Sequence, residues 1–162
     1  MNTQERPAED LFLTNDYSVE VTLVGEDFDP VKATEIIGVQ PDKSGRRGDS
    51  RQPDAENVSS WKQSFWSREI SSRDDINECR DHNISCLIDE IAPHIDTLKS
   101  EAGMDHIYFY YTLASSIGLM NIKLAPETMG RLSGIGADLY ISCFDCFDPN
   151  HAFWSESISE DA

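Results

Sequence analysis

Apolar and polar side chains alternate in the first patterned segment of the chain, "YSVEVTLVG". Every second residue from Val19 to Leu23 is apolar, which is typical of a strand with one buried face. The next segment, "DPVKATEIIG", predicts a short helix, because Asp29 suits the N-cap, Pro30 the first helical position and Gly38 the C-terminal stop. We therefore expect a strand followed directly by a helix.

A longer helical pattern lies in the middle of the chain. Pro93 falls inside it and lacks a backbone N–H, so it is expected to kink the helix or to split it in two. The apolar residues recur at intervals typical of one helical face packed on a sheet, at Ile84, Leu87, Ile88, Ile91, Ile95 and Leu98.

Further strands and one further helix are predicted on either side of this pattern. Their alternation and their turn residues give a strand at 59–70, a strand at 106–114, a turn near Gly118, a strand at 120–125, a helix at 126–136 and a strand at 138–144. The resulting order, β-α-β-α-β-β-α-β, predicts an α+β fold with a mainly antiparallel sheet, helices packed on one face and a partly ferredoxin-like arrangement.

The strand that begins at His106 carries large side chains on both faces. Tyr108 and Tyr110 alternate with an apolar set at Ile107, Phe109, Tyr111 and Leu113. Such a strand is either central in the sheet or uses its second face as a contact surface. We therefore treat Tyr108 and Tyr110 as candidate partner-binding residues.

The segment from Pro41 to Asn57 is rich in Pro, Gly, Ser, Asp and Arg and shows no periodicity, so it is expected to be an exposed loop. It includes "KSGRRGDSR", whose arginines could bind a phosphate or carboxylate or could pair with nearby acids. Adhesion through Arg47-Gly48-Asp49 would need export, and no export signal is seen.

The net charge of the chain indicates which classes of partner it is expected to bind. Thirty acidic residues against thirteen basic ones give a formal net charge of −17. Direct binding to nucleic acid or to an anionic membrane is disfavoured, since phosphates would meet a repulsive field, whereas a basic protein partner is favoured. The alternative is that the charge only maintains solubility.

Length and composition indicate one domain. Residues 16–148 are expected to form it, and the acidic, aperiodic segments 1–15 and 149–162 are expected to be flexible tails. No segment approaches the ~20 apolar residues of a membrane span. We expect a cytoplasmic protein with reduced thiols.

Taken in order, five segments resemble the bacterial family known as domain of unknown function 4279 (DUF4279). They are "YSVEVTLVGEDFDP", "ATEIIGVQPDKSGRRGD", Trp66, the long helix and "IKLAPETMGRLSGIGADLYI", which together span Tyr17 to Phe144. The resemblance implies that the Arg47-Gly48-Asp49 segment is a structural turn. Gly45 stands where an aromatic residue is expected, and Ser142 stands where an acid is expected.

A metal site is a minority interpretation. Cys79, His82, Cys143 and Cys146 have the composition of a zinc site, but their spacing matches no known zinc module, and Cys143 and Cys146 converge only if the chain turns after Phe144. We expect no metal, no cofactor and no catalytic residue.

The leading hypothesis is a non-catalytic, acidic binding protein that acts through protein–protein interaction, most concretely an immunity or antitoxin-like inhibitor of a basic partner. One alternative is an anti-defence protein that mimics nucleic acid. Another is an enzyme or small-ligand domain with its site at residues 26–29 and 43–51. A third is a structural accessory protein that forms a homo-oligomer. The candidate ligand or partner residues are Asp27, Asp29, Arg46, Arg47, Asp49, Trp66, Tyr108 and Tyr110.

Overall fold

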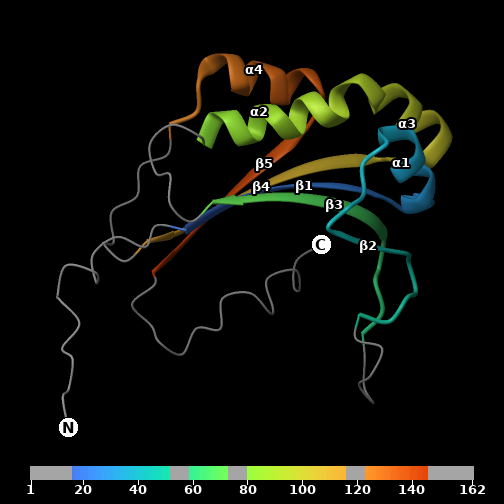
Figure 1. The fold of residues 1–162 in the computed structure, drawn as a ribbon. Helices are drawn as coiled ribbons and strands as arrows, with labels where there is room; N and C mark the ends of the chain where they lie inside the picture. The colour runs from blue at the N-terminus through green and yellow to red at the C-terminus, as the bar shows by residue number, and fades with distance from the viewer. Residues whose placement is uncertain (1–15, 52–58, 73–79, 116–122, 146–162) are drawn as a thin grey trace, which may run out of the picture.

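The computed structural model describes residues 16–51, 59–72, 80–115 and 123–145 (Figure 1). Its strands are β1 (Asp16–Gly25), β2 (Lys43–Gly45), β3 (Ser64–Ser72), β4 (His106–Ser115) and β5 (Asp138–Asp145). Its helices are α1 (Pro30–Ile37), α2 (Arg80–Ile91), the 3-10 turn η2 (Ala92–His94), α3 (Ile95–Ala102) and α4 (Pro126–Gly134). The predicted tails, 1–15 and 149–162, and the predicted turn near Gly118 lie outside the described residues.

The five strands form one sheet in the order β2-β3-β1-β4-β5. All neighbouring strands pair antiparallel except β4 and β5, which are parallel. The connection between β4 and β5 contains α4 and returns the chain to the end of the sheet at which β4 begins, so both strands run in the same direction. The helices lie together on one face of the sheet (Figure 1). The predicted α+β class, with a mainly antiparallel sheet and helices on one face, is confirmed.

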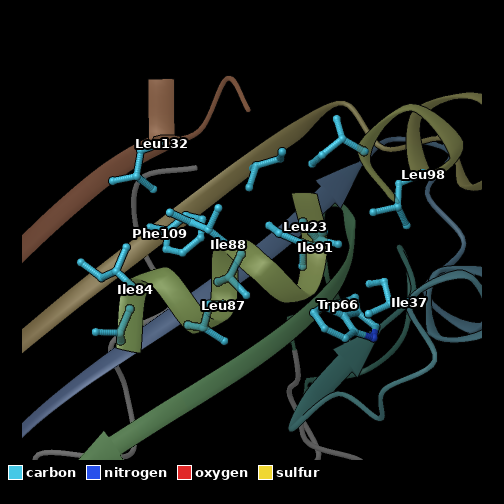
Figure 2. Close-up of a cluster of buried hydrophobic side chains, with 14 of the residues drawn as sticks. Leu23, Ile37, Trp66, Ile84, Leu87, Ile88, Ile91, Leu98, Phe109 and Leu132 are labelled. Carbon is cyan, nitrogen blue, oxygen red and sulfur yellow. The ribbon is translucent and has the colours of Figure 1, made fainter. Parts of the chain in front are cut away.

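The apolar face of the middle helices packs on the sheet (Figure 2). All six apolar positions predicted for that face lie in the core together with Leu23, Trp66 and Phe109. Pro93 splits the helix as predicted, since the 3-10 turn η2 separates α2 from α3.

Local signals place α1 as predicted. Oδ1 of Asp29 accepts hydrogen bonds from the backbone N–H of Val31 (3.0 Å) and of Lys32 (3.4 Å), which caps the helix. Gly38 ends it with φ of 78°, a left-handed conformation that favours glycine.

Two predicted elements need correction. The segment 41–57 is not wholly a loop, because β2 pairs with β3 and Ser50 forms a β-bridge with Ser60, although 52–58 lies outside the described residues. The strand expected at 120–125 is not seen in its described part, Lys123–Ala125, which leads directly into α4. The sequence did not predict β2, because so short a segment shows no periodicity of its own. It becomes a strand only by its long-range pairing with β3.

Candidate functional site

Residues 43–51 and 59–67 form a β-ribbon that we call the β2–β3 arm. Beyond the pairing of β2 with β3, Gly48 N–H donates to the carbonyl of Trp61 (2.9 Å), and Trp61 N–H donates to the carbonyl of Asp49 (2.9 Å). The arm extends from the sheet on the side away from the helices (Figure 1). The candidate loop is thus held by backbone pairing.

The Arg-Gly-Asp segment forms a turn within this arm. Oδ2 of Asp49 accepts a hydrogen bond from the backbone N–H of Arg46 (3.0 Å), and Asp49 N–H donates to the carbonyl of Arg46 (3.0 Å). Gly48 has φ of 87°, which a side chain would strain. Asp49 therefore stabilises the turn, in agreement with the structural role that the sequence predicts for this segment.

The arginines of the turn pair with the acids of the β1–α1 loop. Nη2 of Arg46 lies 3.1 Å from Oδ1 of Asp29, and Nη1 of Arg47 lies 2.5 Å from Oε1 of Glu26. The structure thus brings together the two predicted loops, 26–29 and 43–51. Because each guanidinium already faces a carboxylate, these arginines are poorly placed to attract an anionic ligand.

Replacing both Arg46 and Arg47 by alanine is expected to lower the free energy of unfolding by only about 1 kcal/mol, because exposed ion pairs are screened by water. Urea denaturation measures this effect. Arg68→Ala is the matched control, because Nε of Arg68 lies 3.0 Å from Oε1 of Glu90 in a less exposed ion pair, in which the Arg68 side chain is 33% exposed and the Glu90 side chain 21%. Loss of this ion pair should lower the free energy of unfolding by roughly 2 kcal/mol. A larger loss for the double variant than for Arg68→Ala would contradict the assignment.

Two other predicted site residues lie apart from these pairs. Trp66 is 0% exposed in the core, and its Nε1–H donates to Oγ1 of Thr34 on α1 (3.1 Å). Trp66 therefore connects β3 to α1 and does not line the site predicted at residues 26–29 and 43–51. This corrects its assignment as a binding residue. Asp27 is exposed in the β1–α1 loop.

Tyr108 and Tyr110 lie on the face of the sheet that carries none of the described helices (Figure 1). Strand register and alternation place a polar and aromatic set on this open face, because the core residues of β1, β3 and β4 alternate with it and point to the helix-covered face. The residues of the open face include Glu20, Thr22, Ser67, Glu69, Tyr108, Tyr110, Thr112, Asp138, Tyr140 and Ser142.

Three tyrosines gather on the open face over β4 and the edge strand β5. The rings of Tyr110 and Tyr140 stack with centroids 5.2 Å apart, and Tyr108 meets Tyr140 edge-on at 5.9 Å. Tyr110 is 37% exposed and Tyr140 is 49% exposed, so their rings are accessible to a partner. We call Tyr108, Tyr110 and Tyr140 the tyrosine cluster.

Carboxylates surround the tyrosine cluster. Glu20 is opposite Tyr110 in the β1–β4 register, and Asp138 is opposite Tyr108 in the β4–β5 register. Oε1 of Glu20 accepts hydrogen bonds from the hydroxyls of Thr22 (3.1 Å) and Ser67, which fix its orientation. Aromatic rings beside carboxylates suit a cationic side chain.

The phenols of Tyr108 and Tyr110 resist ionisation. Burial raises the pKa of Tyr108 and of Tyr110 above the ordinary value, and the neighbouring Tyr140 raises both further, with Asp138 acting on Tyr108 and Glu20 on Tyr110. At neutral pH both side chains therefore remain uncharged.

This shift predicts a loss of stability at alkaline pH. The folded protein holds these protons more tightly than the unfolded chain, so the contribution is fully present below the ordinary tyrosine pKa of 10.0 and is lost as pH rises through the raised values. Urea denaturation as a function of pH should show a smaller alkaline decline for the Tyr108→Phe, Tyr110→Phe double variant. An identical decline in wild type and variant would contradict the assignment.

Comparison of the sequence with models of protein families identifies a matching family. The family model described as "Domain of unknown function (DUF4279)" matches residues 15–144. The chain belongs to the DUF4279 family. Comparisons with curated proteins and with solved structures give no significant match. The match extends from β1 to β5 and includes every described element of this DUF4279 domain except the last residue of β5.

The two departures from the expected family pattern have visible consequences in this DUF4279 domain. A Cβ at Gly45 would lie 2.7 Å from Cε1 of Phe65 and 3.0 Å from Nε1 of Trp61, so these rings fill the space that a side chain there would need. Ser142 lies on the open face opposite Thr112.

The zinc interpretation gains no support from the described residues. Among them, no group of three or more His, Cys, Asp and Glu side chains gathers in a way that could hold a metal ion. His82 contacts Cys86 on α2 (Nε2–Sγ 3.4 Å), and Cys143 is exposed on β5. Cys79 and Cys146 lie outside the described residues, so the full ligand set is not tested.

Sequence reasoning missed Glu20, Asp138 and Tyr140 as members of the site. Each lies on the polar side of an alternating strand, and that pattern was the available signal. What joins them to Tyr108 and Tyr110 is the placement of β4 between β1 and β5.

In the part of the chain that the structure describes, no helix is long and apolar enough to cross a membrane.

Proposed function

We propose that this DUF4279 domain is a non-catalytic protein-binding module whose open face binds a basic segment of another protein. The observation that carries the proposal is the tyrosine cluster flanked by Glu20 and Asp138. Arg and Lys side chains bind favourably over aromatic faces, and neighbouring carboxylates add a charge-assisted hydrogen bond.

The charge distribution supports a cationic partner over an anionic one. The formal net charge is −17, so a basic protein is attracted at long range. The arginines that could have opposed this field, Arg46 and Arg47, face Asp29 and Glu26. An immunity or antitoxin-like role, in which this domain inhibits a basic toxin, is the most concrete form of the proposal and rests on size and charge.

Replacing Tyr110 and Tyr140 together by serine is expected to weaken binding of an arginine-rich peptide about tenfold, because two exposed rings that could bind cations are lost. Isothermal titration calorimetry at low salt measures the dissociation constant. Added salt should weaken binding to the wild type as well.

Two control variants test whether the loss of peptide affinity comes from the open face. Val31→Ser removes an apolar side chain of α1 that is 56% exposed, on the helix-covered side, and should leave affinity unchanged. The Arg46→Ala, Arg47→Ala double variant should bind the peptide at least as tightly as wild type. Equal affinity of the tyrosine variant and wild type would refute the proposal.

A further inference from the structure

β5 lies at the end of the strand order, so one of its edges has no strand beside it among the described residues. β5 is eight residues long, "DLYISCFD". An edge strand presents a row of unpaired N–H and C=O groups, which is a template for an added strand. The outer edge of β5 is therefore a potential site of strand addition.

The two edges of the sheet differ in protection. β2 is only three residues long and carries Lys43, and both features discourage edge pairing. β5 is longer and has neither lysine nor proline. It also exposes one large side chain on each face, Tyr140 (49%) and Ile141 (47%). Of the two edges, β5 is the one suited to a partner.

Charge decides which partner fits this edge. Two copies of the chain would each bring a formal net charge of −17. Pairing of β5 with its own copy would therefore bring two strongly acidic chains together, which their mutual repulsion disfavours. An extended basic segment has the opposite charge and meets no such repulsion.

We propose that a basic segment of the partner pairs with the outer edge of β5 as an added strand. The inference rests on the proposed function and extends it by defining the conformation and pattern of the ligand. Side chains of a strand alternate between faces, so one set would lie beside Tyr140 and the tyrosine cluster, and the other beside Ile141. The matching pattern alternates basic with apolar residues.

The test uses a peptide of alternating arginine and valine and two versions of it. In one version the arginine amides are N-methylated, and in the other the valine amides are. Because alternate amides of a strand point to opposite edges, only one of the two sets can face β5. We expect one methylated peptide to bind wild-type protein at least about tenfold more weakly and the other to bind almost normally.

Each outcome separates this inference from the proposed function. Equal effects of the two methylation patterns, small or large, would overturn strand addition. The proposed function would stand in that case if the unmethylated peptide still binds wild type and loses affinity for the Tyr110→Ser, Tyr140→Ser variant. No binding of the unmethylated peptide would overturn both. Slower amide hydrogen exchange in β5 on binding is the expected independent sign of an added strand.

Discussion

Trp66→Ala is expected to lower the free energy of unfolding by about 3–5 kcal/mol, the largest effect among the substitutions considered. The side chain is 0% exposed and lies between the sheet and the helices, where it contributes to the core shown in Figure 2. Its removal leaves a cavity and also deprives Thr34 of the indole hydrogen bond. Urea denaturation followed by circular dichroism measures the loss.

Trp61→Ala is the matched control for this substitution. Trp61 lies on the β2–β3 arm, where its ring packs on Phe65 at 4.6 Å and under the guanidinium of Arg51 at 4.7 Å. It is only partly buried, so its loss should cost roughly 1 kcal/mol. Similar losses for the two tryptophan variants would contradict the assignment of Trp66 to the core.

Gly25→Ala is expected to cost about 3 kcal/mol, because the added methyl group meets backbone rather than a movable side chain. A Cβ at Gly25 would lie 2.3 Å from the carbonyl oxygen of Gly103. At this point the β1–α1 loop lies against the junction of α3 and β4, and Asp29 N–H donates to the carbonyl of Ala102 (2.8 Å). Thermal unfolding should therefore shift to a markedly lower midpoint.

Gly130→Ala provides the opposite expectation within the same protein. Gly130 lies inside α4, and a Cβ there would meet nothing within 4 Å. Alanine should stabilise the helix by roughly 0.5–1 kcal/mol, because glycine is a poor helix former. Destabilisation by Gly130→Ala, or tolerance of Gly25→Ala, would show that the packing around these glycines is not as described.

The elements that sequence predicted best are those with local signals. Asp29, Pro30 and Gly38 fix α1 through capping, a constrained φ and a left-handed stop, and none of these depends on the rest of the chain. Pro93 divided the middle helix for the same reason. Alternation was enough to identify β1, β3 and β4, since each buries one face in the core.

The features that sequence missed depend on which strands are neighbours. β2 is too short to show a pattern and becomes a strand only by pairing with β3. Tyr140 joins Tyr110 only because β5 lies parallel to β4, and Glu20 joins them only because β1 lies on the other side of β4. Trp66 was predicted as a candidate binding residue on a strand, whereas the packing of that strand under the helices buries its side chain in the core.

A nuclear magnetic resonance titration of the isotope-labelled chain with an arginine-rich peptide at low salt tests most directly whether the open face binds a cationic partner. We predict shifts concentrated at Glu20, Tyr108, Tyr110 and Tyr140, with little change in the turn from Arg46 to Asp49. Shifts confined to that turn and to residues 26–29, or no shifts at all, would contradict the proposal that the open face is the binding surface.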